Sequence, residues 1–364
     1  MKNIRNSMQQ KKRVLLAMSG GVDSSAAALL LQQQGYEVFG ITMKLWRFSQ
    51  PDRCLNENDI EKAQHLANTL NIPLQIVDIK NDFKENVIDY FVDAYARGIT
   101  PNPCTMCNPT IKWGALWKYF DTHFFDYYAT GHYARINHQN GRYFVTKAKD
   151  LHKDQSYFLW RLSQAQLSKT LFPLGDFTKD EIRDYVANLG FNTVSKQRES
   201  QDVCFLENID YRGFLKEQRP DIDTRIGPGN FVLSDGTVVG QHKGYYHYTI
   251  GQRKGLEIAL GEPMYVIRIE VETNTVVLGR KTELETTQLL VDDIHLMKYD
   301  ALKDGDSYQI RIRYRSKGVE GKIMSVNDKQ LKIEFNENVS AVTPGQNAVF
   351  YEGDDVIGGG VILE

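Results

Sequence analysis

The stretch that decides the fold runs from Val14 to Gln34 and reads VLLAMSGGVDSSAAALLLQQQ. A short apolar run ends in Ser19-Gly20-Gly21, and the segment from Ser24 onward has the composition of a helix that Gly35 closes. The pattern therefore predicts a strand, a glycine turn and a helix in direct succession.

The same alternation continues along the chain. Strands are expected at 38–43 and 74–79, and helices at 60–70 and 87–95. Strands that alternate with helices predict a parallel sheet covered on both faces, so the expected fold class is α/β.

The region from Thr100 to Thr110 breaks this rhythm with three prolines and two cysteines, which predicts a loop. A helix at 113–120, a strand at 127–130 and a hairpin turn at Asn140-Gly141 are expected after it. Thr178 to Glu181 has the pattern of a capping box, which predicts the start of another helix.

Beyond about Asp210 glycine-rich turns separate short alternating runs, which are strand and turn signals. Strands are expected at 265–271 and 275–278. From about Leu284 the alternation continues, with a strand expected at 308–314 among others. This pattern predicts a small β-barrel or sandwich at the end of the chain.

The 364 residues predict two or three domains at roughly 100–200 residues each. Hydrophobic residues make up 41% and charged residues 25%, which is typical of globular proteins, and no apolar run approaches the roughly 20 residues of a membrane span. The polar start at Met1–Arg13 argues against a signal peptide, and four cysteines are too few for a disulfide scaffold. We therefore expect a reducing, cytoplasmic location.

The net charge of the chain does not predict binding to nucleic acid. The chain has 44 basic and 46 acidic side chains and a net charge of −2. A nucleic acid would therefore have to bind a local basic patch.

The turn Ser19–Ser25 has the composition of an anion site. Backbone N–H groups and the positive end of a helix dipole attract negative charge, and two glycines allow a phosphate to approach closely. Asp23 would repel a bare phosphate, so it points to a Mg²⁺ ion between its carboxylate and phosphate oxygens. A Walker A loop is excluded because Gly-Lys-Ser/Thr does not occur here. The alternative is a serine that caps an ordinary turn between strand and helix.

Cys104 and Cys107 form a Cys-x-x-Cys pair, and Cys54 and Cys204 lie far from it in the sequence. Such a pair can be half of a zinc site, but the second pair that a structural zinc needs is absent from the sequence. A thioredoxin-like role would need the pair at the start of the first helix, where the glycine turn lies. A buried apolar cysteine is the alternative for Cys204, and no role is expected for Cys54.

Ser-Gly-Gly-Val-Asp-Ser at 19–24 resembles the PP-loop of ATP pyrophosphatases of the adenine-nucleotide α-hydrolase type. Those enzymes cleave ATP between the α and β phosphates. Amide-forming ligases and RNA thiolases share the loop, so the loop alone does not select a substrate.

The wider sequence resembles the bacterial and organellar tRNA-specific 2-thiouridylases of the MnmA type in the order and spacing of its motifs. That family replaces the C2 oxygen of the wobble uridine of certain tRNAs by sulfur in an ATP-dependent reaction. The motifs that carry the resemblance over nearly the whole chain are Thr100-Pro101-Asn102-Pro103, Cys107-Asn108, Ile111-Lys112-Trp113, Ala129-Thr130-Gly131-His132-Tyr133, Lys153-Asp154-Gln155-Ser156-Tyr157, Cys204-Phe205 and Thr343-Pro344-Gly345-Gln346.

The resemblance implies three domains. These are a Rossmann-like PP-loop catalytic domain with a parallel sheet at 1–208, a small central β domain at 209–283 and a C-terminal, tRNA-contacting β-barrel at 284–364. It also implies ATP with Mg²⁺ as cofactors, Mg²⁺ being held through the phosphates near Asp23. The implied ATP-binding residues are Ala17, Met18, Ser19, Gly20, Gly21, Val22, Asp23, Ser24, Met43 and Gly131.

The resemblance also implies the sulfur chemistry. Cys204 would carry a persulfide received from a sulfur-relay protein or a cysteine desulfurase, and Cys107 would be the nucleophilic partner thiol. Either order of attack ends in a Cys107–Cys204 disulfide. Cys104 departs from the family, which commonly has aspartate here in the loop that meets the target base.

The implied contacts with tRNA come from local groups. The residues concerned are Asn102, Pro103, Cys104, His132, Lys153, Asp154, Gln155, Arg313, Tyr314 and Gln346. Arginines at 311, 313 and 315, alternating along a strand, would place their guanidinium groups on one face toward phosphate. The alternative for that strand is a solvated sheet face.

Three other interpretations stay open from the sequence. Cys104, Cys107 and Cys204 could together hold a [4Fe–4S] cluster, because thiolates suit iron–sulfur ligation. The chain could be another PP-loop ligase, although such enzymes need no cysteine pair. It could also be a non-catalytic RNA-binding protein, although its nucleotide loop and cysteines are intact.

Overall fold

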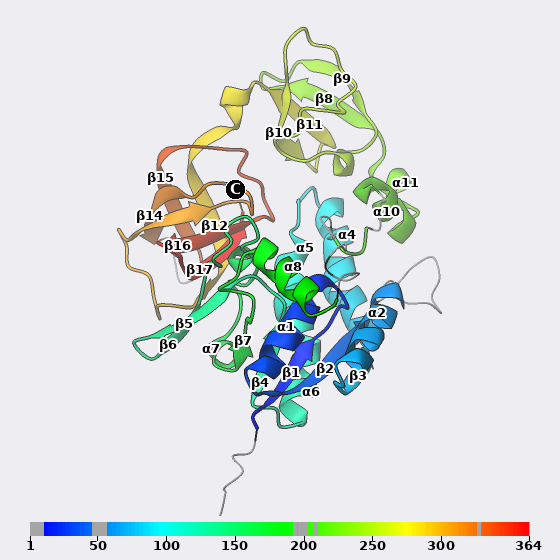
Figure 1. The fold of residues 1–364 in the computed structure, drawn as a ribbon. Helices are drawn as coiled ribbons and strands as arrows, with labels where there is room; N and C mark the ends of the chain where they lie inside the picture. Colours follow the sequence, from blue (N-terminus) through cyan, green and yellow to red (C-terminus); the bar gives the residue numbers. More distant parts are fainter. Residues whose placement is uncertain are drawn as a thin grey trace, which may run out of the picture.

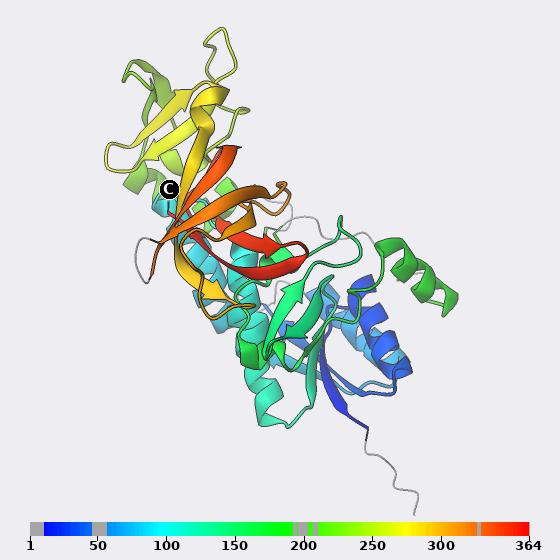
Figure 2. The same cartoon turned by 90° about the vertical axis from the view of Figure 1, so that its left-hand side faces the viewer.

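The computed structural model describes residues 11–45, 57–191, 195, 203–206, 210–325 and 329–363. Cys54 and most of the polar start at Met1–Arg13 lie outside these ranges. The chain forms a parallel sheet flanked by helices, then a smaller β part, then a β-barrel (Figure 1). A quarter turn shows that the three parts make an elongated molecule (Figure 2). In the described ranges, no helix has the length and apolar character needed to cross a membrane.

The first sheet is parallel throughout. Its strands in spatial order are β3 (Leu74–Asp78), β2 (Glu37–Lys44), β1 (Arg13–Ala17), β4 (Tyr127–Thr130) and β7 (Thr170–Leu171). The central strand β1 is apolar because both of its faces are buried. Val14 packs with α1 (Val22–Gln33), α2 (Glu57–Thr69) and α8 (Lys179–Asn188) on one face, whereas Leu15 packs with the helix that carries Trp113 on the other. The α/β prediction is confirmed.

Two long helical stretches cross the side of the sheet that Leu15 faces. The first comprises α3 (Lys80–Phe83), the π-helix η1 (Lys84–Asp89) and α4 (Tyr90–Ala96), and the second comprises α5 (Pro103–Cys107), the π-helix η2 (Asn108–Ala115) and α6 (Leu116–Thr122). The predicted loop at 100–110 is therefore wrong from Pro103 onward. Pro103 occupies the first turn of α5, where a missing N–H costs nothing and the fixed φ of proline favours the helix.

A β-hairpin leaves the first part and reaches the barrel. β5 (Arg135–Gln139) and β6 (Arg142–Thr146) pair across Asn140 and Gly141, whose φ values of 52° and 79° fit a type I′ turn. Thr146 pairs with Asp355 of the barrel. The short elements η3 (Ser156–Phe158) and α7 (Gln164–Leu167) follow the hairpin. The predicted turn is confirmed, whereas its pairing with the barrel was not expected.

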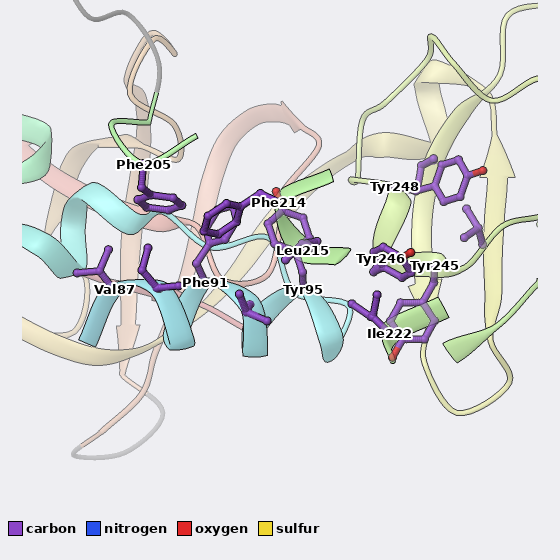
Figure 3. Close-up of a cluster of buried hydrophobic side chains, with 14 of the residues drawn as sticks. Val87, Phe91, Tyr95, Phe205, Phe214, Leu215, Ile222, Tyr245, Tyr246 and Tyr248 are labelled. Atoms are coloured by element: carbon purple, nitrogen blue, oxygen red, sulfur yellow. The ribbon is translucent and has the colours of Figure 1, made fainter. Parts of the chain in front are cut away.

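The central part begins with two helices that the sequence analysis missed, α10 (Tyr211–Gln218) and α11 (Ile222–Ile226). A four-stranded sheet follows in the order β10 (Tyr265–Glu270), β11 (Thr275–Gly279), β8 (Gly229–Leu233) and β9 (Val238–His242), with the 3₁₀ turns η4 (Tyr245–His247) and η5 (Lys281–Leu284) beside it. Figure 3 shows the aromatic cluster that joins this part to α4, in which Phe91, Phe214 and Tyr246 are buried.

The C-terminal part is a closed barrel of six antiparallel strands. They are β12 (Glu285–Leu296), β15 (Leu331–Ser340), β14 (Val319–Ser325), β13 (Ser307–Arg311), β16 (Asn347–Glu352) and β17 (Asp355–Ile362), and β12 pairs with β17 to close the ring. The predicted barrel is confirmed, but the predicted strand at 308–314 is too long. β13 ends at Arg311, and Ser316 then donates its N–H and its hydroxyl to the Arg313 carbonyl in a turn.

Candidate active site

The turn between β1 and α1 leaves the first turn of the helix open to an anion. Gly21 is the N-cap and supplies no side-chain cap, and the hydroxyls of Ser24 and Ser25 donate to the Gly21 carbonyl at 3.1 and 2.8 Å. Gly20 has φ +74°, and a Cβ there would lie 2.5 Å from the Ala63 nitrogen of α2. Only glycine therefore fits this position, and the backbone N–H groups of the turn can approach a phosphate closely.

The structure brings Gly131 to this turn. A Cβ at Gly131 would lie 3.0 Å from the carbonyl carbon of Asp23, so glycine allows the end of β4 to pack on the loop. Met18 is buried, and Met43 is partly buried at the carboxyl end of β2. These residues therefore lie at the sheet edge where parallel α/β folds bind ligands.

Asp23 has two partners that the sequence analysis did not predict. Lys179 Nζ lies 2.7 Å from Asp23 Oδ1, and the Tyr133 hydroxyl donates to the same oxygen at 2.9 Å. Lys179 is the first residue of α8, where the helix dipole disfavours a positive charge. A lysine at the first position of the helix that the capping box predicts is thus a weak sequence signal of an acidic partner.

The paired cysteines lie on a helix that changes its winding. Cys104 and Cys107 belong to α5, and Lys112 follows five residues after Cys107 in the π-helical segment η2. A π-helix bonds residue i to residue i+5, which is the spacing of Cys107 and Lys112, and the Lys112 charge acts on the Cys107 thiol. Asn102 is the N-cap of α5, and the Thr105 hydroxyl donates to its carbonyl at 2.8 Å.

Cys204 is held by its neighbour Phe205, which is 4% exposed. Figure 3 shows the Phe205 ring above the helix that carries Phe91. The rings of Phe91 and Phe214 each lie 5.1 Å from that of Phe205. Cys107 packs against the same cluster, so a single apolar core positions both cysteines.

The three thiols share one electrostatic environment. Burial raises the pKa of Cys104, and it raises the pKa of Cys107 to about 11 and that of Cys204 to about 12, while the Lys112 ammonium opposes each rise. Cys104 and Cys204 are nevertheless exposed to solvent. Both thiols are therefore surrounded by protein and still in contact with solvent.

His132 is buried and orients Lys112. Its Nε2 lies 3.0 Å from Lys112 Nζ, and its Nδ1 lies 2.6 Å from the Thr130 hydroxyl. An ammonium can only donate, so Nε2 accepts and the ring is neutral with its proton on Nδ1. Burial and the Lys112 charge accordingly hold the pKa of His132 well below its usual range.

The Lys153-Asp154-Gln155 segment is tied to the protein interior. Asp154 is 2% exposed and accepts from Ala148 N–H and from the Ser156 hydroxyl at 3.0 and 2.8 Å. Burial raises its pKa, and these hydrogen bonds oppose the rise. Gln155 Oε1 accepts from Tyr133 N–H at 2.9 Å, so this segment is bonded to the residue that contacts Asp23. Lys153 is partly exposed.

Three residues expected to contact tRNA, Arg313, Tyr314 and Gln346, belong to the barrel part of the chain, and each makes different contacts. Arg313 Nη2 donates to the Ala341 carbonyl at 2.7 Å and to the Thr343 hydroxyl at 3.0 Å. The Tyr314 ring lies 4.5 Å from that of Phe158. The expectation that arginines 311, 313 and 315 alternate along one strand is wrong, because the strand ends at 311.

Gln346 reaches the segment before the cysteine helix. Its Nε2 donates to the Thr100 carbonyl at 3.0 Å, and Thr100 N–H donates to the Pro344 carbonyl at 3.1 Å. The barrel loop therefore holds the backbone that leads into Asn102 and Pro103.

Comparison with known proteins identifies the family. Family models match in succession: "tRNA methyl transferase HUP domain" at residues 12–208, "tRNA methyl transferase PRC-barrel domain" at 212–280 and "Aminomethyltransferase beta-barrel domain" at 286–362. The tRNA-specific 2-thiouridylase MnmA 3 of Phocaeicola vulgatus is 47% identical over 334 residues, which are 91% of this chain and 88% of the relative. The tRNA-specific 2-thiouridylase MnmA of Cytophaga hutchinsonii is 46% identical over 91% of each chain.

The chain belongs to the tRNA-specific 2-thiouridylase family. Among solved structures, the U34-tRNA thiolase NcsA from Methanococcus maripaludis with its [4Fe-4S] cluster is 18% identical over 58% of this chain and 67% of that chain. Its TM-score is 0.34, which is too low to carry an argument about this member of the family.

Two expectations about the thiols of this 2-thiouridylase family member find no support. Cys104, Cys107 and Cys204 are free, so the expected Cys107–Cys204 disulfide is absent from the described residues. Nor do those residues include a group of three or more histidine, cysteine or acidic side chains that could hold a metal ion. The three cysteines therefore do not fit a [4Fe–4S] cluster in this arrangement.

Proposed function

We propose that this protein is an ATP-dependent tRNA-uridine 2-sulfurtransferase that thiolates the wobble uridine. The observation that carries the proposal is the combination of a glycine-lined anion turn at the carboxyl edge of a parallel sheet with thiols held by one core. The curated relatives carry the name of that activity over nine-tenths of this chain. Methyl transfer, which the family-model descriptions mention, would use neither feature.

The first chemical step needs the anion turn. The C2 oxygen of uracil is a poor leaving group, so it attacks the α phosphate of ATP and pyrophosphate departs, which leaves the base as an ester of AMP. Ser19–Ser24 would hold the phosphates through backbone N–H groups, with Met43 and Gly131 completing the nucleotide site. Asp23 fits Mg²⁺ as one carboxylate beside phosphate oxygens, and the ion would supply charge neutralisation.

The second step needs the thiols. A persulfide on Cys204 has a terminal sulfur that attacks C2 and expels AMP. Cys107 then attacks the Cys204 sulfur, the bond to the transferred sulfur breaks, and 2-thiouridine and a disulfide result. In the other order, Cys107 attacks first and releases hydrosulfide, which then attacks C2. Either order requires a thiol reductant in each turnover.

The Cys107 thiolate is the group that both orders require. Burial disfavours it, and Lys112, held by His132, is the group that offsets this effect. The persulfide would come from a sulfur-relay protein or a cysteine desulfurase.

The tRNA would lie along the surface where the cysteine helix meets the barrel. We propose that Lys153, Tyr314 and Gln346 contact tRNA at this surface, and that His132 and Arg313 act through Lys112 and the Thr343 loop. The other residues that we propose for the tRNA-binding surface are Asn102, Pro103, Cys104, Asp154 and Gln155.

We propose domain limits of 1–208, 209–283 and 284–364, and a cytoplasmic location for the protein.

The direct test is mass spectrometry of nucleosides from unmodified tRNA treated with the protein, ATP, a persulfide donor and a reductant. We expect one AMP and one pyrophosphate for each 2-thiouridine formed. AMP formation with no 2-thiouridine would instead indicate a different PP-loop ligase.

A further inference from the structure

The phosphate-binding turn has no cation of its own. Residues Ser19–Ser25 include neither lysine nor arginine, whereas a bound triphosphate carries several negative charges. Asp23 adds another negative charge at the start of α1. A fixed positive charge at this site must therefore come from another part of the chain.

Lys179 brings such a charge from 156 residues away in the sequence. Its side chain is 7% exposed, and its Nζ lies 2.7 Å from Asp23 Oδ1, while the Asp23 side chain is 36% exposed. The Tyr133 hydroxyl donates to the same oxygen at 2.9 Å, and Nζ lies 5.7 Å from the centre of the Tyr133 ring. The carboxylate is thus held at one oxygen by two donors.

The base of the Lys179 side chain is fixed as well. The backbone N–H of Lys179 donates to Asp150 Oδ2 at 3.0 Å. Thr178 and Glu181 form a complete capping box around the start of α8. A buried ammonium at a helix N-terminus is unfavourable by both desolvation and dipole. The Asp23 carboxylate at the nucleotide turn offsets these costs with a charged hydrogen bond.

We propose that Lys179 is a positioning residue of the ATP site, which fixes the Asp23 carboxylate and places a permanent positive charge beside the polyphosphate. The inference rests on the proposed use of ATP at this turn. Lys179 is not among the ATP-site residues that the sequence motifs imply. The contrary interpretation is an ion pair that only joins α8 to α1.

The experiment compares Lys179→Met with Lys179→Arg and with the control Lys149→Met. Lys149 is an exposed lysine that pairs with Glu181 at the same helix end, 2.7 Å away, so its removal tests loss of a nearby ammonium that does not contact Asp23. Steady-state AMP formation gives separate KM values for MgATP and for tRNA. The shift in Tm caused by MgATP measures nucleotide binding without the sulfur chemistry.

We expect Lys179→Met to raise the KM for MgATP by about ten- to hundredfold, the effect of losing a charged hydrogen bond, with the KM for tRNA unchanged. Lys179→Arg should recover part of the loss, and Lys149→Met should match wild type. A folded Lys179→Met protein with the wild-type KM for MgATP would overturn the proposal.

A second variant covers the case in which Lys179→Met does not fold. Tyr133→Phe removes the other donor to Asp23 Oδ1 and leaves no charge unpaired, so a smaller rise in the MgATP KM is expected. A wild-type KM for MgATP in Tyr133→Phe would show that fixing Asp23 Oδ1 does not affect nucleotide binding, and would overturn the proposal. Absence of 2-thiouridine with the wild-type enzyme would refute the sulfurtransferase function, whatever the variants show. The role of Lys179 would then be decided separately by the shift in Tm that MgATP causes in the wild type and in the variants.

Discussion

The Thr105 hydroxyl lies 2.7 Å from Asn347 Oδ1 and 2.8 Å from the Asn102 carbonyl and shares its one proton between these two acceptors; Thr105 and Asn347 are both buried although 242 residues separate them. Thr105 lies between the two cysteines of α5, and Asn347 begins β16 of the barrel. Tyr157, which follows the Lys153-Asp154-Gln155 segment, donates to the Asn347 carbonyl at 2.9 Å. One barrel residue therefore joins the cysteine helix to a segment proposed to contact tRNA.

Replacing Asn347 by alanine should loosen this junction. The Thr105 hydroxyl would keep its bond to the Asn102 carbonyl, so we expect a cost of about 1–2 kcal/mol in the free energy of unfolding rather than loss of the fold. Urea unfolding measures it. The control is Asn336→Ala, whose amide bonds an exposed glutamate, Glu320, and which should change stability little. Equal effects of the two substitutions would contradict a joining role for Asn347.

Asp23→Asn should abolish formation of AMP and pyrophosphate while tRNA affinity stays nearly unchanged. The asparagine oxygen can still accept from Lys179 and Tyr133, but the negative charge that would meet Mg²⁺ is lost and the buried Lys179 ammonium loses its counter-charge, so the Tm of the variant is measured to show that it is folded. Filter binding of tRNA and a pyrophosphate-release assay measure the two effects. Normal pyrophosphate release by this variant would remove Asp23 from the nucleotide site.

Phe205→Ala should separate the two half-reactions. Phe205 is buried among Phe83, Phe91 and Phe214, and its truncation would leave a cavity beside Cys204 at a cost of about 3–5 kcal/mol. Sulfur transfer should fall while adenylation, which uses the distant glycine turn, persists at temperatures where the variant is folded. Phe124→Ala is the control, because that ring is 85% exposed. Parallel loss of both half-reactions would show that the effect is general.

The reactivity of Cys107 should rise with pH across the neutral range. Burial raises the pKa of its thiol to about 11, so the thiolate fraction increases about tenfold for each pH unit between pH 7 and pH 10. Lys112→Met removes the ammonium that favours the thiolate and should move this profile to higher pH. Alkylation of Cys107 by iodoacetamide, followed by mass spectrometry, measures it. Lys118→Met, an exposed lysine on α6, should leave the profile in place.

The sheet and the glycine turn could be predicted from the sequence because local signals decide them. The apolar run before Ser19 and the helix formers after Gly21 leave one arrangement, and the structure has it. The cysteine helix could not be predicted in this way. In the sequence, the three prolines at 101, 103 and 109 predict an irregular loop. In the structure, Pro103 starts α5 and Pro109 lies in the first turn of the π-helix η2, so neither of these two prolines interrupts a helix.

The site contacts that were missed are set by the tertiary fold. Lys179 and Asp23 meet only because α8 packs beside α1, which no local pattern encodes. Arg313 was expected to face phosphate, and its setting depends on where β13 ends. The turn after Arg311 directs Arg313 Nη2 to the Ala341 carbonyl and the Thr343 hydroxyl, two contacts that an alternating strand does not predict.

The final prediction concerns Cys104, where this chain departs from the common family residue. Cys104→Asp restores the aspartate, and the sulfur chemistry proposed above uses only Cys107 and Cys204. Cys104 is exposed to solvent on α5, so a carboxylate there is hydrated, and the surrounding protein that raises the pKa of the Cys104 thiol would raise the pKa of the carboxyl group as well. We therefore expect the variant to retain thiolation and to leave Cys107 and Cys204 able to form a disulfide on oxidation.

A cluster mechanism would give the opposite result. Cys104 would then be an iron ligand, and a carboxylate is a harder donor than a thiolate, so the substitution would loosen the cluster. Wild type and Cys104→Asp are purified without oxygen, and iron, visible absorbance and thiolation with a persulfide donor are measured for both. Stoichiometric iron in wild type, with thiolation lost when the iron is removed and regained when it is restored, would replace the persulfide mechanism. Thiolation by both proteins without iron would leave Cys104 as a local replacement that the sulfur transfer does not need.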